Sequence, residues 1–364
     1  MKSRRCVLRS AIDLKSIGNS NSKSMFSGKK IVIAGGSGFI GRAMAARWAA
    51  DNEVTILTRE LSGEANNAYD QGESLNVRYA RWDAKTVEGW AAALKGADVL
   101  INLSGKSVNC RYTPRNRRAI LSSRVDATEA LGAAIEACPI PPKLWINAAS
   151  ATIYRHAEDR PQDEATGEMH NDFSVQVCKA WEAAFFAQKT PYTRKVALRM
   201  AIVLGHGGVL VPYKRLALAG LGGHQGNGRQ MFSWIHIDDL CRMVEWLADR
   251  PESEGVYNAS APTPVCNEAF MQSIRATLNV PFGLPAPAVL LRMAAMVIGT
   301  EVELLLKSRW VIPARLSSEG FVFQYPRIDK AVADLLNDGR VKHSNAAANS
   351  GSANFAPSFT SKKR

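Results

Sequence analysis

The 364-residue sequence lacks the patterns that identify disulfide-bonded, metal-binding and membrane-spanning proteins. Its six cysteines are scattered, and no two have the C-x-x-C spacing of a zinc or redox site. The longest apolar stretch, near 288–299, is interrupted by Arg292. It is also too short to cross a bilayer, which takes about 20 apolar residues. We therefore expect a protein of a reducing compartment that uses neither a metal ion nor a membrane.

Acidic residues are scarce at both ends of the chain, and this explains the net charge of +13. Residues 1–30 carry eight Lys/Arg and one Asp, and residues 340–364 carry five Lys/Arg and no acid. The intervening residues have a net charge of only +1. A basic surface for nucleic acid would need positive charge in the folded part, so we expect no nucleic-acid partner.

The two ends also lack the apolar residues of a folded segment. Residues 1–28 contain no apolar stretch of the length that a secretory signal needs, and their composition fits either a disordered extension or a mitochondrial or plastid transit peptide. Residues 341–364 are rich in Ser, Ala, Asn and Gly, and we expect a disordered tail. The expected location is the cytoplasm, or an organelle if residues 1–28 are a transit peptide.

Strands alternate with helices over the first half of the chain. Short apolar runs predict strands, and longer segments with helical spacing predict helices. The expected strands are 30–34, 53–58, 77–82, 99–103, 143–149 and 195–200, and the expected helices are 39–50, 116–137 and 174–188. This alternation predicts an α/β fold with a doubly wound parallel sheet. We expect a Rossmann domain over 29–204 and a smaller, mostly helical substrate-side region over 205–340, from which one strand near 256–260 returns to the sheet.

A glycine-rich turn follows the first expected strand and opens a helix. Gly35, Gly38 and Gly41 have the spacing G-x-x-G-x-x-G. Gly35 permits a tight turn, Gly38 lets the backbone approach a pyrophosphate, and Gly41 lets the helix pack against the strand. The N–H groups at the start of that helix attract a phosphate. The sequence therefore predicts a dinucleotide site here.

The end of the second expected strand selects the cofactor. An acidic side chain at this place would bind the ribose 2′-hydroxyl of NAD. The chain instead has Thr58 and Arg59, and a guanidinium pairs well with a 2′-phosphate. This favours NADP(H), with a solvated surface arginine as the alternative.

Several segments together resemble the short-chain dehydrogenase/reductase superfamily in its extended, epimerase-like branch. The segments are 35–41, 102–105, 150–154, 199–208, 220–223, 232–240 and 311–323. More narrowly, the chain is similar to atypical NADP-binding "epimerase family" proteins, sometimes labelled cell-division-inhibitor-like, and to their C-terminal domain. The resemblance covers about residues 30–337.

This resemblance implies cofactor contacts along one edge of the sheet. The residues expected at the pyrophosphate are Gly35, Ser37, Gly38, Phe39, Ile40 and Gly41. Those expected at the adenosine end are Thr58, Arg59, Trp82 and Asp83. Those expected near the nicotinamide ribose are Leu103, Ser104 and Gly105. The resemblance also places Arg111 near the cofactor and Ile202 beside the nicotinamide.

The catalytic residues of the superfamily are only partly present. There, a Ser polarises the substrate, a Tyr transfers the proton, and a Lys four residues later lowers the pKa of the Tyr. Ser150 matches the Ser. If Glu182 is aligned with the acid that often follows the Tyr/Lys pair, Ser174 stands at the Tyr position and Cys178 at the Lys position. The Tyr-x-x-x-Lys dyad is therefore absent.

Other side chains are candidates for the missing proton donor. The resemblance gives Tyr154 as a residue of the substrate pocket, and Ser150 and Tyr154 are the candidate catalytic residues. Tyr112 and Cys178 are further candidates, with packing or pocket lining as the alternative for each.

Two functions follow from this reading. The first is an NADP(H)-dependent oxidoreductase or epimerase that acts on an unknown small carbonyl or sugar-like substrate with a non-standard acid–base. The second is a non-catalytic NADP(H)-binding sensor or interaction protein. A homodimer is expected only by analogy with the superfamily.

Overall fold

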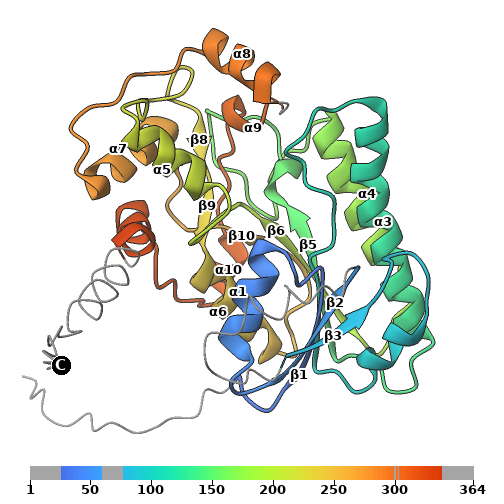
Figure 1. Cartoon of the computed structure of the whole chain (residues 1–364). Helices are drawn as coiled ribbons and strands as arrows, with labels where there is room; N and C mark the ends of the chain where they lie inside the picture. Colours follow the sequence, from blue (N-terminus) through green and yellow to red (C-terminus); the bar gives the residue numbers. More distant parts are fainter. Residues whose placement is uncertain (1–25, 60–76, 299–300, 302, 338–364) are drawn as a thin grey trace, which may run out of the picture.

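The computed structural model describes residues 26–59, 77–298, 301 and 303–337, and its centre is a sheet of seven parallel strands (Figure 1). The strand order is β10-β6-β5-β4-β1-β2-β3, as in a doubly wound Rossmann sheet. The strands are β1 (Lys30–Ala34), β2 (Glu53–Thr58), β3 (Val77–Arg81), β4 (Val99–Asn102), β5 (Leu144–Ser150), β6 (Arg194–Met200) and β10 (Gly255–Ala259). The predicted fold class is confirmed.

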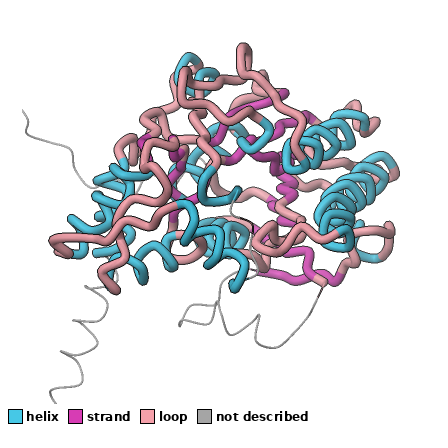
Figure 2. The backbone as a smooth tube through the Cα atoms, turned by 90° about the horizontal axis from the view of Figure 1, so that it is seen from above, coloured by secondary structure: helices cyan, strands magenta, loops and turns pink. Residues whose placement is uncertain are grey.

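Two layers of helices cover the sheet (Figures 1 and 2). Helices α1 (Phe39–Trp48) and α6 (Ile237–Ala248) pack on the face that carries Ile31 and Ile33 of β1. Helices α3 (Pro114–Glu136) and α4 (Phe173–Ala187) pack on the face that carries Val32 and Ala34. Successive side chains of a strand point to opposite faces, so a continuously apolar β1 contributes to both cores.

Helix α3 begins at Pro114, earlier than the expected start near Asn116. Thr113 precedes the helix with extended backbone, and its side chain accepts a hydrogen bond from the Asn116 backbone N–H at 3.3 Å. Pro114 then occupies the first turn, where a missing N–H has no cost. The spacing of apolar residues does not predict that the helix begins with Thr113 and Pro114, because neither residue belongs to its buried apolar face.

The C-terminal half forms a smaller body on top of the sheet (upper left in Figure 1). Its elements are β7 (Ile202–Leu204), α5 (Leu210–Leu218), β8 (Met231–Phe232), β9 (Trp234–His236), β11 (Val265–Cys266), α7 (Asn267–Leu278), α8 (Ala288–Ile298), α9 (Glu303–Leu306) and α10 (Ala314–Ser318). Phe232 and Phe270 stack at 4.1 Å, and Tyr213 meets Phe270 edge-on at 5.1 Å. These rings share a core with Val332 and Leu335 from a helical segment over 328–337.

One strand of the C-terminal half belongs to the main sheet. β10 pairs in parallel with β6, in the register Tyr257 to Leu198, so the strand expected near 256–260 is present. Two short 3₁₀ helices, η1 (Gly89–Leu94) and η2 (Ala151–Ile153), were not expected. Within the described ranges, no helix is long and apolar enough to span a membrane. Of the extensions expected over 1–28 and 341–364, residues 1–25 and 341–364 lie outside the described residues. Phe26 is instead part of the core, where its ring meets Trp48 at 5.4 Å, so the folded part begins earlier than expected.

Candidate functional site

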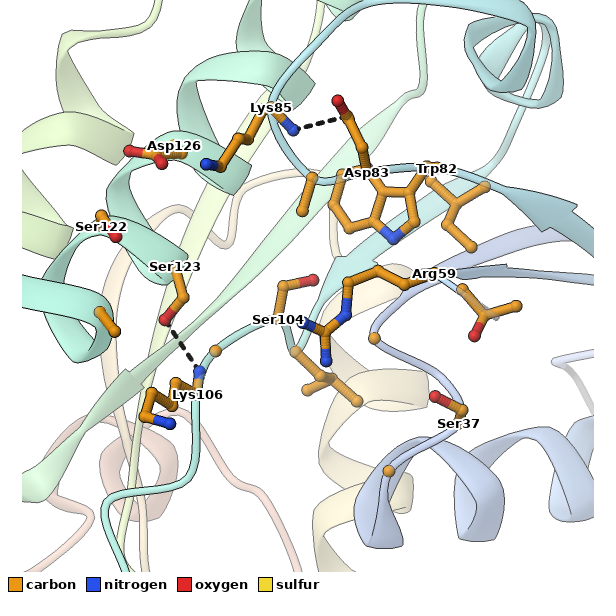
Figure 3. A pocket seen from close by; sticks show the side chains of 18 of the residues that line it. Ser37, Arg59, Trp82, Asp83, Lys85, Ser104, Lys106, Ser122, Ser123 and Asp126 are labelled. Atoms are coloured by element: carbon orange, nitrogen blue, oxygen red, sulfur yellow. Dashed lines mark hydrogen bonds between the residues drawn. The ribbon is translucent and has the colours of Figure 1, made fainter. Parts of the chain in front are cut away.

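A cavity of about 780 Å³ lies at the carboxyl ends of β1, β2, β3 and β4 (Figure 3). Ligands of open α/β sheets bind at this edge. Ten residues predicted to hold the cofactor line the cavity: Gly35, Ser37, Gly38, Thr58, Arg59, Trp82, Asp83, Leu103, Ser104 and Gly105. The structure therefore brings together residues that are up to 70 positions apart in the sequence.

The glycine turn forms the floor of this cavity. Gly35 has a φ of +74°, and a Cβ there would lie 3.0 Å from the Leu103 carbonyl carbon, so only glycine fits without strain. A Cβ on Gly41 would lie 2.5 Å from the Gly36 Cα. The third glycine thus lets α1 approach the turn itself, rather than the strand as expected. No side chain caps the start of α1, which leaves the N–H groups of its first turn available to a phosphate.

The adenosine end of the cavity is formed by the ends of β2 and β3. Arg59 is exposed and follows the buried Thr58. Trp82 is nearly buried and meets Trp90 edge-on at 5.2 Å, which fixes its ring. Asp83 accepts hydrogen bonds from the backbone N–H groups of Thr86 and Lys85 at 2.9 and 2.8 Å, and these bonds lower the pKa of its carboxyl group.

Lys85 also lines the cavity, and the sequence did not predict it as a cofactor-binding residue (Figure 3). Its position depends on the tight turn that Asp83 holds after β3. An Asp followed by two or three polar residues at the end of a strand is the signal that could have indicated this turn. Its exposed ammonium points toward Asp126 of α3 and not toward the Arg59 guanidinium (Figure 3).

The opposite wall contains a buried hydroxyl with no partner. Ser104 Oγ makes no hydrogen bond to any described residue, although the side chain lines the cavity. Its backbone N–H donates to Asn102 Oδ1 at 3.0 Å, and Asn102 Nδ2 donates to Asn147 Oδ1 at 2.8 Å. Because this buried network fixes the loop after β4, the free Ser104 hydroxyl is held ready for a polar ligand.

Part of α3 completes the cavity, and this contribution was also missed. Small and polar side chains face the cavity at helical spacing, namely Ala119, Ser122, Ser123 and Asp126. Ser123 Oγ accepts the backbone N–H of Lys106 at 2.8 Å and so ties the helix to the loop after β4 (Figure 3).

Five of the residues predicted for the cofactor do not line the cavity. Phe39, Ile40 and Gly41 lie in the first turn of α1, directly after Gly38. Arg111 is exposed in the loop before α3, and Ile202 lies in β7 beside Trp234 of β9. Contacts of Arg111 and Ile202 with a cofactor remain predictions.

Ser150 ends β5 and lies next to α4. Its Oγ accepts the backbone N–H of Thr152 at 3.2 Å and also contacts the Cys178 thiol. Burial raises the pKa of Cys178 to about 11, so the thiol stays protonated at neutral pH. The position expected for the dyad Lys therefore holds a neutral group in contact with Ser150.

The phenol of Tyr112 lies beside Ser174, which stands at the Tyr position of the missing dyad. Tyr112 itself comes from the loop before α3. Its ring meets Phe173, the first residue of α4, edge-on at 5.1 Å. Its hydroxyl interacts with the Ser174 hydroxyl, and its backbone N–H donates to Glu301 Oε1 at 2.7 Å. Burial raises the pKa of Tyr112, with the bond to Ser174 acting in the opposite direction. A phenol thus lies beside the residue that replaces the dyad Tyr.

Tyr154 lies elsewhere, inside the protein. Its side chain is fully buried, and its hydroxyl donates to Asn258 Oδ1 at 3.0 Å and accepts from Arg199 Nη1 at 2.8 Å. Arg199 in turn forms a buried two-fold ion pair with Glu182. Burial raises the pKa of Tyr154. This hydroxyl is committed to a structural network, so the structure does not support the expected proton transfer to a substrate.

Comparison with known proteins identifies the family. The sequence pattern of the "NAD dependent epimerase/dehydratase family" matches residues 31–260, and that of "Domain of unknown function (DUF1731)" matches residues 286–335. The mouse (Mus musculus) Epimerase family protein SDR39U1 is 29% identical over 84% of this chain and 99% of its own length. Epimerase family protein YfhF of Bacillus subtilis is 31% identical over 85% of this chain and 98% of its own.

Solved structures agree with these sequence matches. The human epimerase family protein SDR39U1, crystallised with NADPH, superposes with a TM-score of 0.71 at 28% identity, and the match covers 84% of this chain and 98% of that one. A nucleoside-diphosphate sugar epimerase from Corynebacterium glutamicum gives 0.65 at 26% identity, over 88% and 62% of the two chains. This chain therefore belongs to the NAD dependent epimerase/dehydratase family, in its extended short-chain dehydrogenase/reductase branch, and carries the DUF1731 domain at its C-terminal end.

Proposed function

We propose that this protein binds NADP(H) in the 780 Å³ cavity and uses it to reduce or epimerise a small carbonyl or sugar-like substrate. The observation that carries the proposal is the charge at the adenosine end. Arg59 lines the cavity there, and β2 ends in Thr58 and Arg59 rather than in a carboxylate. A guanidinium suits a 2′-phosphate, whereas NAD calls for an acceptor of the ribose hydroxyl.

The remaining walls fit the rest of a dinucleotide. The left-handed turn at Gly35 and the uncapped start of α1 suit a pyrophosphate. The unpartnered Ser104 hydroxyl suits a ribose on the nicotinamide side. The NADPH in the structure of the human relative agrees with this assignment.

The residues near Ser150 suggest how the chain would handle the substrate. Bound NADP(H) would supply or accept a hydride at the substrate carbon. The Ser150 hydroxyl would hold the substrate oxygen, in the role of the superfamily Ser. The proton for that oxygen would come from Cys178, which contacts Ser150, or from Tyr112, which lies beside Ser174. Both groups are kept neutral by burial and so are weak acids rather than bases at pH 7.

A non-catalytic NADP(H)-binding sensor is the second candidate function. It is favoured by the composition of α4, where Ser174 and Cys178 stand in the places of the dyad. In the superfamily the Lys activates the Tyr, and no lysine occupies that place here.

Cofactor binding is tested by thermal shift of the full chain with NADPH, NADP⁺ and NADH. A ligand at about 100 times its Kd adds roughly 2.7 kcal/mol to the stability of the folded state. We expect a clear shift with NADPH and a smaller one with NADH. Arg59→Glu should reverse the preference, whereas Lys95→Glu, an exposed charge on the loop before β4, should leave it unchanged. Equal shifts with NADPH and NADH in the native protein would refute the NADP(H) assignment.

Turnover separates the two functions. NADPH oxidation would be followed at 340 nm with a panel of aldehydes, ketones and keto-sugars, and epimerisation, which causes no net oxidation of the cofactor, would be followed by NMR of sugar substrates. If the protein is an oxidoreductase that uses Ser150, Ser150→Ala should abolish turnover. The rise in unfolding temperature on adding NADPH should persist in this variant. Binding of NADPH without turnover of any carbonyl in the panel would favour the sensor.

A further inference from the structure

Among the residues that the structure describes, two arginines near Cys178 have no hydrogen bond to an acidic side chain. The first, Arg124 of α3, lies against the loop after β4, because a Cβ on Gly105 would meet its Cζ at 3.1 Å. Its Nη1 donates to the backbone oxygens of Ile120 and Lys106, at 2.9 and 3.1 Å. Its guanidinium covers the Trp181 ring at 5.1 Å. Arg124 thus keeps its full charge beside the cofactor cavity.

The second arginine, Arg309, comes from the C-terminal region. Among the residues that the structure describes, its guanidinium makes no hydrogen bond, and its buried Nη1 has no partner. Its ion pair with Glu303 is long, at 3.8 Å, and Glu303 Oε1 already accepts from Lys307 Nζ at 3.1 Å. Lys307 also pairs with Asp172, so both acids near Arg309 are already engaged. A buried guanidinium N–H without an acceptor is costly and rare, which points to an acceptor on a ligand.

The side chains near the two guanidinium groups include uncharged ones. Tyr112 and Cys178 each interact electrostatically with both Arg124 and Arg309, so the four side chains lie near one another. Cys178 in turn contacts Ser150. The Arg309 side chain is 15% exposed, so the group is not sealed inside the protein. Two positive charges therefore lie near neutral hydrogen-bonding groups, a combination that suits a compact anion.

One segment beside these groups is basic, while Glu301 and Glu303 supply acidic groups near Tyr112. The segment 99–125, which leads from β4 into α3, contains six basic residues and no acidic residue. Over the described ranges, none of these six forms an ion pair. Unpaired positive charge at the entrance of a site raises the local concentration of anions.

We propose that the substrate carries a compact oxyanion, a carboxylate or a phosphate, which binds between Arg124 and Arg309 and so places the reacting carbon beside Ser150. The inference rests on the proposed function, because it concerns the substrate of that NADP(H) site. It selects anionic carbonyl compounds over neutral ones. Arg309 is the residue that determines this choice, since its buried Nη1 has no acceptor within the described part of the chain.

The test uses the full chain saturated with NADPH, so that the phosphate-binding groups of the cofactor cavity are already filled. Inorganic phosphate, acetate and the neutral acetamide would be titrated by calorimetry at constant ionic strength in chloride. The variants are Arg309→Met, Arg309→Lys and Arg124→Met. Lys95→Met is the matched control, because it removes one exposed charge before β4. Thermal unfolding of each variant with and without NADPH would show that the fold and the cofactor site are intact.

We expect phosphate or acetate to bind the native protein and Lys95→Met equally, and acetamide to bind neither. Arg309→Met and Arg124→Met should weaken anion binding at least tenfold, and Arg309→Lys should weaken it less than Arg309→Met. Preference for one anion identifies the oxyanion of the substrate. Because Nη1 has no partner, Arg309→Met should unfold at the same or a higher temperature than the native protein.

Three results would overturn the inference. They are no anion binding to the native protein, unchanged binding in Arg309→Met, and a loss of binding in Lys95→Met as large as in the arginine variants. If NADPH still stabilises the protein in these cases, only the substrate class is wrong. If NADPH does not stabilise it, the proposed function fails as well.

Discussion

Replacing Gly41 with alanine tests whether the close approach of α1 to the glycine turn builds the cofactor site. The new Cβ would lie 2.5 Å from the Gly36 Cα and 2.7 Å from the Gly36 carbonyl oxygen. Both neighbours are backbone atoms, so α1 or the turn has to move. Overpacking of this kind costs about 1–3 kcal/mol. For a chain of this size, that corresponds to a fall in Tm of roughly 1–5 °C.

The same movement should weaken NADPH binding. The turn and the first N–H groups of α1 are expected to meet the pyrophosphate, and one lost hydrogen bond to a charged group costs about 1.5–3 kcal/mol, or roughly 10- to 100-fold in Kd. Thermal unfolding and a fluorescence titration of NADPH would measure both effects. Gly89→Ala is the control, because a Cβ there meets nothing within 4 Å. Equal Tm and Kd values for the two variants would refute the reasoning.

Three further predictions concern the residues around α4. Tyr154→Phe leaves Asn258 Oδ1 and Arg199 Nη1 without the phenol hydroxyl and should lower the free energy of unfolding by about 1–3 kcal/mol in urea melts; a loss of NADPH turnover without a loss of stability would instead restore its catalytic role. Glu182→Gln leaves the buried Arg199 guanidinium without its counter-ion and should cost about 3–5 kcal/mol in the same assay, and a cost below that of an exposed pair would contradict the burial argument. The pKa of Cys178 is raised to about 11, so the folded state keeps its proton after the unfolded thiol has ionised, and stability should fall as the pH rises from 9 to 11. Cys178→Ser should flatten this part of the stability profile, and an unchanged profile would assign the effect to other groups.

The sequence alone predicted the parts of the molecule that depend on neighbouring residues. The run of apolar residues before Gly35 defines β1, and the glycine spacing defines the turn and the start of α1. Arg59 follows β2 directly, so its place at the sheet edge follows from the strand. These features are local, and hydrophobic periodicity and turn chemistry are enough to predict them.

The parts that were missed depend on contacts between distant segments. Tyr154 was expected in a pocket, but its hydroxyl pairs with Asn258, 104 residues later, and with Arg199, 45 residues later. Lys85 reaches the cavity only because Asp83 folds the chain after β3. No local pattern reveals that Arg309 lies near Tyr112 and Cys178, since the residues come from three separate elements.

The location of these residues bears on how the protein could act without the standard dyad. In the superfamily one helix supplies both the Tyr and the Lys, so the acid–base is fixed by helical spacing alone. Here α4 supplies only Ser174 and Cys178, and the phenol and the positive charge next to them belong to Tyr112 and Arg309. The ion pair of Lys307 with Asp172 holds the C-terminal segment against the start of α4, and Glu303 of the same segment shares the ammonium. The anion site proposed above requires this arrangement, because Arg309 belongs to the DUF1731 match over 286–335 whereas Ser150, Tyr112 and Cys178 belong to the epimerase-family match.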